Sequence, residues 1–144
     1  MKDVDADAIT EYIAQQFDGV DVVLASTEAG SPEVAWGDTF FMHHLDHNFP
    51  FATIVTKDYP GFDEASKLDR PGVFRLNIGL SRGTFEALFP EDREHDFAAL
   101  DRVMPHPVYG RNHWACVLNP CDATFEQLKP LLAEAYERAA TRHP

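Results

Sequence analysis

Polar side chains that could bind a ligand occupy positions that otherwise have the pattern of a β-strand. Apolar and polar residues alternate from Phe74 to Ile78, and the polar positions are Arg75 and Asn77. Because successive side chains of a strand point to opposite faces, Arg75 and Asn77 should share one face of a sheet. A guanidinium and an amide supply hydrogen-bond donors and an amide oxygen, which is the chemistry of ligand recognition. No activated nucleophile accompanies them, so the pattern favours binding over catalysis.

The candidate ligand-binding set extends along the neighbouring predicted strands and their ends. Its members are Trp36, Asp38, Thr53, Lys57, Tyr59, Arg75, Asn77, His106, Tyr109 and His113. If helices cover one face of the sheet, these residues would form a polar patch rimmed by aromatic rings on the other face. The structural alternative is that Arg75 pairs with Asp38 or a neighbouring acid across strands. A shift of one residue in strand register would move the whole set to the opposite face.

A second group of chemically capable residues follows the second predicted strand. His43, His44 and His47 flank Asp46, and imidazoles beside a carboxylate are ligands that zinc or nickel would take. Adjacent residues of a strand point to opposite faces, however, so only a subset of these side chains could converge. No pair of cysteines or glutamates elsewhere completes a site. The stretch therefore favours a polar hairpin tip, and we expect no metal and no cofactor.

Neither cysteine has the surroundings of a catalytic nucleophile. Cys116 lies inside the apolar run Trp114–Leu118, which is typical of a buried, small hydrophobic residue. Cys121 falls in a predicted loop without an evident partner. We therefore expect no catalytic residues. An enzyme of unrecognised type that uses His106, His113 or Cys121 is an alternative.

The charge balance excludes some partners. The 144 residues contain 24 Asp and Glu against 12 Lys and Arg, which gives a net charge of -12. Binding to nucleic acids or anionic membranes depends on basic side chains, so both are disfavoured. Nucleic-acid binding would need local clustering of Lys57, Lys67, Arg70, Arg75, Arg82 and Arg111. No apolar signal segment and no run of about 20 apolar residues occurs, so we expect a cytoplasmic protein.

Periodicity predicts a single α+β domain over residues 1–144. The predicted helices cover 5–17, 81–89 and a segment from 122 or 124 to 142, and the predicted strands cover 20–26, 34–43, 51–57, 73–79 and 113–118. A helical turn is expected at 97–102, and Pro130 predicts a kink or a restart of the last helix. Connections of hairpin length dominate. We therefore expect a twisted, largely antiparallel sheet of about five strands, with the N- and C-terminal helices packed on one face.

Two resemblances add to this interpretation. Four segments, Glu33–Asp38, Pro50–Gly61, Leu68–Gly79 and Met104–Gly110, resemble a bacterial family catalogued only as a domain of unknown function, and the resemblance covers most of the chain. The segments Pro107–Tyr109 and Asn112–Trp114, followed by a helix that carries Tyr136, are similar to the closing pattern of the MmcQ/YjbR-like proteins.

The second resemblance implies a CyaY/frataxin-like fold, a twisted antiparallel sheet with helices on one face. The DNA-binding label of the MmcQ/YjbR-like group conflicts with the net charge of -12, so only the fold is carried over. The sequence thus favours a non-catalytic module that binds a small molecule or a protein partner. Nucleic-acid binding is the first alternative.

Overall fold

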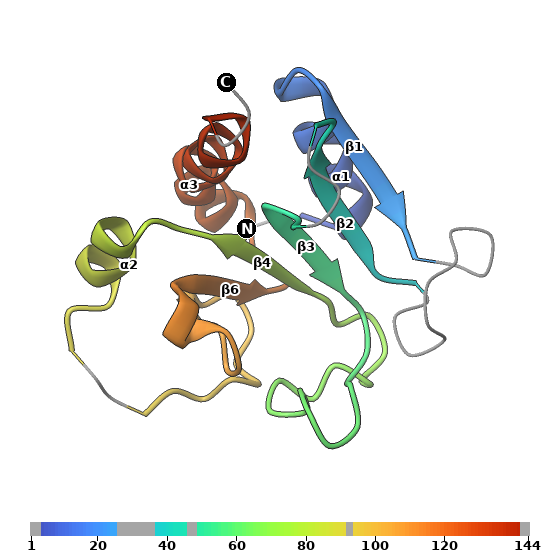
Figure 1. The fold of residues 1–144 in the computed structure, drawn as a ribbon. Helices are drawn as coiled ribbons and strands as arrows, with labels where there is room; N and C mark the ends of the chain where they lie inside the picture. Colours follow the sequence, from blue (N-terminus) through green and yellow to red (C-terminus); the bar gives the residue numbers. More distant parts are fainter. Residues whose placement is uncertain (1–3, 26–36, 46–48, 92–93, 142–144) are drawn as a thin grey trace.

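The chain folds into an antiparallel sheet with helices against one face (Figure 1). The computed structural model describes residues 4–25, 37–45, 49–91 and 94–141. Its helices are α1 (Ala6–Gln16), α2 (Arg82–Leu88) and α3 (Asp122–Thr141), with a short 3-10 helix η2 (Gly110–Asn112). Its strands are β1 (Val20–Leu24), β2 (Thr39–His43), β3 (Ala52–Val55), β4 (Arg75–Gly79), β5 (Met104–Pro105) and β6 (Trp114–Leu118). The strand order is β1-β2-β3-β4-β6-β5, and every pairing is antiparallel. The predicted α+β class is confirmed.

The helices begin where capping residues occur in the sequence. The Asp5 carboxylate accepts the N–H of Ala8 at the start of α1, and the Ser81 hydroxyl accepts the N–H of Thr84 at the start of α2. The helix α3 continues through Pro130, so the predicted restart there is wrong. Proline cannot donate a backbone hydrogen bond to the helix. The stabilisation from burying five side chains of its apolar face offsets the loss of that bond.

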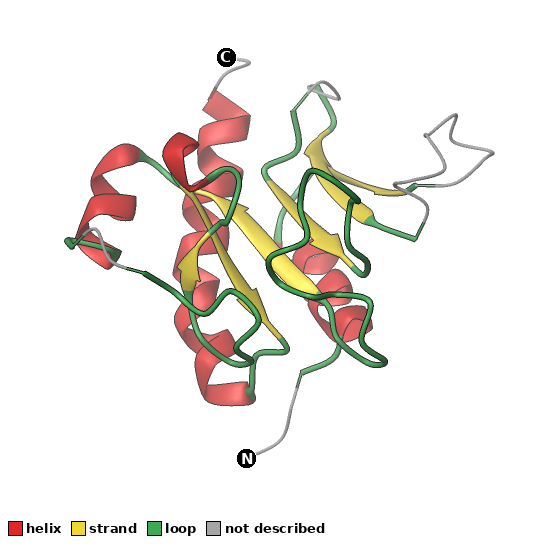
Figure 2. Ribbon diagram, turned by 90° about the horizontal axis from the view of Figure 1, so that it is seen from below, coloured by secondary structure: helices red, strands yellow, loops and turns green. Residues whose placement is uncertain are grey.

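The main core lies between the sheet and the helices α1 and α3. Ile9 and Ile13 of α1 and Leu132 of α3 pack in one cluster with Ile54 of β3 and Leu76 of β4. Figure 2 shows the long helices on one side of the strands and the long connecting loops on the other. Removing the apolar surface of this layer from water is the main stabilising contribution to the fold.

The opposite face of the sheet carries the polar residues. Register places Phe40, Thr53, Asn77, Cys116 and Met104 in one cross-strand row from β2 to β5. A neighbouring row joins Val55, Arg75 and Leu118. The predicted face of Arg75 and Asn77 is therefore confirmed. Loops cover the β6 side of this face, where Leu68 and Met104 pack with Cys116 in a second apolar cluster.

Some predicted boundaries were wrong. Strand β5 was expected to be loop, because it has only two residues and one of them is Pro105. Within 97–102 only residues 97 and 98 form a turn, and the expected helical turn is absent there. Strand β6 starts at Trp114, since His113 has φ 70° and cannot continue a strand. The expected second strand begins at Thr39 in the structure, and residues 34–36 of that prediction lie outside the described residues.

Candidate functional site

Arg75 is the centre of a buried polar network on the face opposite α1 and α3. Its guanidinium donates from Nη1 and Nη2 to the two carboxylate oxygens of Asp63, at 3.0 and 2.5 Å. Nη1 also donates to the Ser66 hydroxyl at 3.0 Å, and Nε donates to Oδ1 of Asn77 at 2.8 Å. Arg75 and Ser66 are both 0% exposed. The structural alternative, in which Arg75 pairs with an acid, is therefore confirmed in kind, but the acid is Asp63 from a loop and not Asp38 across strands.

A tight turn brings Asp63 to the sheet. The backbone of Tyr59 and Asp63 exchanges two hydrogen bonds, at 2.9 and 2.8 Å, and the N–H of Phe62 donates to the Tyr59 carbonyl at 3.0 Å. Pro60 and Gly61 occupy the two central positions of this turn, and Gly61 has φ 74°. Proline then glycine is the preference of a type II turn, which needs a positive φ at its second central residue.

A hydrogen bond between Asp38 and Tyr59 fixes the start of the Tyr59–Asp63 turn. Asp38 is 0% exposed, and its two carboxylate oxygens accept the N–H of Thr56 at 3.0 Å and the Tyr59 hydroxyl. Burial raises the pKa of Asp38, while the hydrogen bonds from Tyr59 and Thr56 and the positive charges of Lys57 and Arg75 lower it. Burial, followed by the hydrogen bond to Asp38, raises the pKa of Tyr59. The two side chains therefore act as a latch between β2 and the loop.

Removing the latch should destabilise the fold. We expect Tyr59→Phe to lower the free energy of unfolding by about 1–3 kcal/mol, because the buried Asp38 carboxylate loses a donor. The pKa of Asp38 should rise further in the variant, since the Tyr59 hydrogen bond holds it down. Urea denaturation and NMR titration of Asp38 measure the two effects. Tyr109→Phe, at an exposed tyrosine, is the control and should change stability by less than about 0.5 kcal/mol. Equal effects of the two variants would contradict the latch.

A cavity of about 580 Å³ opens above the Arg75 network. Its floor is formed by polar side chains of β3, β4 and two loops, namely Thr53, Asp63, Arg75, Asn77 and His106. Its walls and rim are aromatic, with Phe40, Phe49, Tyr59, Phe62, Tyr109 and Trp114. Phe49 is 64% exposed, Phe62 is 56% exposed and Tyr109 is 41% exposed, so apolar rings stand at the mouth. The site therefore combines an apolar opening with a polar base.

His106 reaches the network from the segment after β5. Its Nδ1 accepts the N–H of Val108 at 3.0 Å and of Tyr109 at 2.9 Å, and its Nε2 lies 3.1 Å from Nη2 of Arg75. Burial, with the positive charge of Arg75, lowers the pKa of His106 to about 3, although Asp63 opposes this. The ring is therefore neutral near neutral pH and cannot serve there as a cationic acid.

The structure brings together most of the residues predicted for the site. Thr53, Tyr59, Arg75, Asn77, His106 and Tyr109 line the cavity. Asp38 contacts the site through Tyr59, and Lys57 is not one of the lining residues. His113 lies elsewhere, with its ring centroid 5.6 Å from that of Phe85 beside α2. Trp36 lies outside the described residues.

The sequence prediction missed the acidic partner of Arg75 and some of the aromatic residues at the rim of the cavity. Asp63, Phe62 and Phe49 were not in the candidate set, although all three line the cavity. The segment Tyr59–Asp63 contained a usable signal, because a proline–glycine turn returns its two ends to the same place. Phe49 follows a histidine-rich stretch and had no comparable signal.

The histidine-rich stretch forms no metal centre in the part of the chain that the structure describes. The rings of His43 and His44 lie 4.4 Å apart, and Nδ1 of His43 accepts the N–H of Leu45 at 3.2 Å. Nδ1 of His44 lies 3.2 Å from the carbonyl oxygen of Gly19. His47 and Asp46 lie outside the described residues, so the expected hairpin tip stays a prediction.

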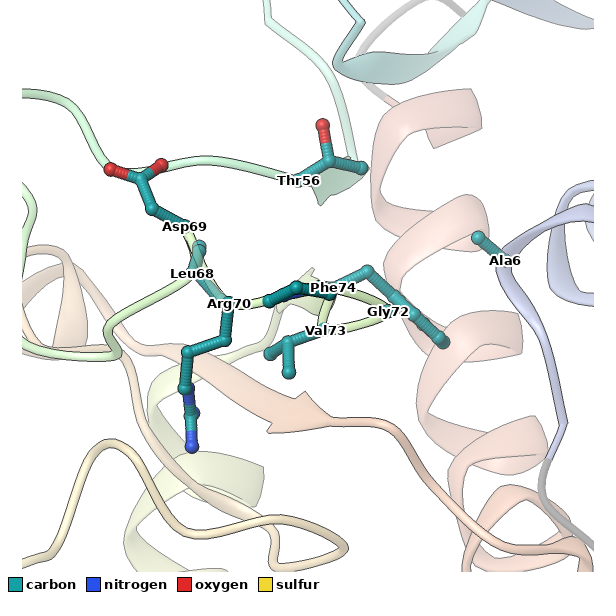
Figure 3. Close-up of a pocket in the computed structure, with 9 residues that line it drawn as sticks. Ala6, Thr56, Leu68, Asp69, Arg70, Gly72, Val73 and Phe74 are labelled. Atoms are coloured by element: carbon teal, nitrogen blue, oxygen red, sulfur yellow. The ribbon is translucent and has the colours of Figure 1, made fainter.

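A second hollow of about 500 Å³ lies where residues 68–74 approach α1 (Figure 3). Asp69 and Arg70 point in different directions there, and neither aims at a common centre. Arg70 donates to the carbonyl oxygens of Ser66, Lys67 and Ala98, at 2.8–3.1 Å, and Asp69 accepts the N–H of Asp58 at 3.1 Å. These polar groups organise the loop, so the hollow is a weaker candidate than the aromatic cavity.

Both cysteines are buried. Cys116 is 2% exposed, as predicted, and burial raises the pKa of its thiol to about 12. Cys121 is 6% exposed, with Sγ 3.4 Å from the hydroxyl of Thr124. A thiolate nucleophile at Cys116 is therefore disfavoured near neutral pH.

Comparison with known proteins identifies the family. Residues 4–144 match the family of unknown function DUF6194, and the chain therefore belongs to it. This match confirms the predicted resemblance to a domain of unknown function. It gives no support to the MmcQ/YjbR-like resemblance or to a bacterial origin. No curated protein and no solved structure matches the chain. None of the helices in the described residues combines the length and the apolar character of a membrane span.

Proposed function

We propose that this member of DUF6194 is a non-catalytic module that binds a small molecule in the aromatic-rimmed cavity. The observation that carries the proposal is a cavity of about 580 Å³ whose base is polar and whose mouth is apolar. Sites for small molecules generally have volumes of about 300–1,000 Å³, with apolar walls and a few placed polar groups. Exposed apolar rings gathered at one cavity, such as those of Phe49 and Phe62, are typical of a binding site.

The polar base favours binding over chemistry. The donors of Arg75 are directed at Asp63, Ser66 and Asn77, so the guanidinium acts as a fixed part of the wall. His106 is neutral and its Nδ1 is held by backbone N–H groups. The alternative of an enzyme that uses His106, His113 or Cys121 is weakened, because His113 packs against Phe85 and neither His113 nor Cys121 lines the cavity.

Nucleic-acid binding has less support. Of the basic residues that would have to cluster, Arg75 is buried against Asp63, Arg70 binds loop carbonyls and Arg82 pairs with Glu86. The net charge of -12 also repels a phosphate backbone. A protein partner that inserts an apolar side chain between the exposed rings is the remaining alternative, and the experiment below separates it from a small molecule.

The test is a thermal-shift screen of metabolites, nucleotides, metals and short DNA, repeated with rim variants. A ligand that binds the native state raises the melting temperature in a concentration-dependent way. We expect Phe49→Ala/Phe62→Ala to weaken the binding of a hit about tenfold, because both rings contact the cavity. Leu100→Ala, at an exposed residue away from the cavity, should leave the affinity unchanged. A hit that binds equally well to both variants would contradict the site, and a flat screen would favour a protein partner.

A further inference from the structure

Arg75 determines the direction of the hydrogen bonds along the cavity floor. A guanidinium has only donors, and its Nε donates to Oδ1 of Asn77 at 2.8 Å. The amide of Asn77 must therefore turn Nδ2 toward Thr53, whose hydroxyl oxygen accepts at 2.9 Å. The Thr53 hydroxyl keeps its own hydrogen, and Nδ2 keeps a second one. Within the described residues neither remaining hydrogen has a protein acceptor, although Thr53 and Asn77 both line the cavity.

His106 adds a third donor to the floor. Because its Nδ1 accepts two backbone N–H groups, at 3.0 and 2.9 Å, the neutral ring carries its proton on Nε2. Nε2 lies 3.1 Å from Nη2 of Arg75, which is also a donor, and 3.9 Å from Oδ2 of Asp63. In the described part of the chain this N–H thus has no acceptor within hydrogen-bonding distance. The side chain is 5% exposed, so leaving the donor unsatisfied is costly.

Three donors of the floor, on Thr53, Asn77 and His106, therefore have no acceptor among the described residues. We infer that the cavity binds an uncharged molecule that has a flat apolar body and a carbonyl oxygen. The oxygen accepts hydrogen bonds from the floor donors of Thr53, Asn77 and His106, and the body lies among the rim rings of Phe49 and Phe62. This inference rests on the proposed function and specifies the ligand class for the same cavity.

The electrostatics favour a carbonyl over a carboxylate. The charge of Arg75 is neutralised by Asp63, which binds it through both carboxylate oxygens at 3.0 and 2.5 Å. A ligand carboxylate would lose its hydration without gaining a free cationic partner among the floor residues. The net charge of -12 adds repulsion. An amide, ketone or lactone oxygen brings the same acceptor geometry without these costs.

The test uses three probes with the same ring system: naphthamide, naphthoate and naphthalene. Each probe is titrated into the ¹⁵N-labelled protein, and binding is followed by the backbone amide signals of Phe49, Thr53 and Phe62. We expect the affinity for naphthamide to be at least about tenfold higher than the affinity for the other two probes. We expect Thr53→Val to weaken naphthamide about three- to tenfold and to leave naphthalene unchanged, because it removes the hydroxyl but keeps the shape. Thr53→Ser keeps the hydroxyl and should bind naphthamide like the wild type.

Each outcome bears on a different statement. If naphthalene binds at the rim as tightly as naphthamide, the cavity binds small molecules and the acceptor inference is wrong. Tighter binding of naphthoate, or an unchanged naphthamide affinity in Thr53→Val, also overturns the inference while the proposed function survives. If no probe shifts the amide signals of the cavity residues, both the proposed function and the inference are contradicted. Binding of naphthalene to Thr53→Val shows that this variant is folded.

Discussion

Asp63→Asn should lower the free energy of unfolding by about 3–5 kcal/mol, the largest effect we expect from a single substitution in this chain. The side chains of Arg75 and Asp63 are 1% and 8% exposed, and they meet at 2.5 and 3.0 Å. Replacing the carboxylate by an amide of the same shape leaves a buried guanidinium without its counter-charge. Urea denaturation, read by circular dichroism, measures the loss.

The surface pair Arg82–Glu86 provides the matched control. It joins the same kinds of charged groups at 3.0 Å, but its side chains are 77% and 60% exposed. Glu86→Gln should therefore cost no more than about 0.5 kcal/mol. The double variant Asp63→Asn/Arg75→Met should lose less than the sum of the two single variants, because it removes both charges. Similar losses in Asp63→Asn and Glu86→Gln would show that the buried pair is not a main support of the loop.

Local patterns predicted the parts of the fold that depend on short-range physics. The helices predicted from 5 and 81 begin at Asp5 and Ser81, whose side chains accept N–H groups only three positions away. The alternation around Arg75 and Asn77 predicted their shared face, because the period of a strand is a property of the backbone. These features do not depend on where other segments lie.

The parts that failed depend on partners distant in sequence. Strand β5 has two residues, and it exists because β6 offers it an edge. The structural alternative paired Arg75 with Asp38 or a neighbouring acid across strands, yet its acidic partner, Asp63, comes from a loop 12 positions away. Its placement requires the turn at Gly61 and the Asp38–Tyr59 latch together. No periodic pattern in the sequence encodes that combination.

The candidate site was predictable in composition and less so in extent. Polar residues at strand positions and aromatic residues nearby correctly indicated Thr53, Arg75 and Asn77 as neighbours. His106 joined them although it lies 31 residues beyond Arg75, whereas His113, only a few residues further on, did not. The difference is the short strand β5, which fixes the chain just before His106. The sequence did not reveal β5, so it could not show that His106 reaches the site and His113 does not.

The second large effect concerns pH, and it should arise from His106. Its native pKa is about 3, against an ordinary value of 6.5. Between these values the unfolded chain binds a proton on this ring and the native chain does not, so unfolding takes up a proton. Stability conferred by the neutral ring is therefore complete above pH 6.5 and is lost as the pH falls toward 3. A shift of this size corresponds to roughly 5 kcal/mol.

His106→Asn isolates this contribution. The amide oxygen of asparagine can accept the N–H groups of Val108 and Tyr109 that Nδ1 now accepts, and it does not titrate. The stability advantage of the wild type over the variant should therefore shrink by a few kcal/mol between about pH 7 and about pH 4 in urea titrations. Asp38 works in the opposite direction, because its raised pKa makes the native state bind a proton more tightly and lose stability as the pH rises through that pKa. Asp38 is present in both proteins, so its contribution largely cancels in the difference. Parallel stability profiles would mean that the ring is not held neutral in the native state, and the donor on Nε2 would then have to be assigned differently.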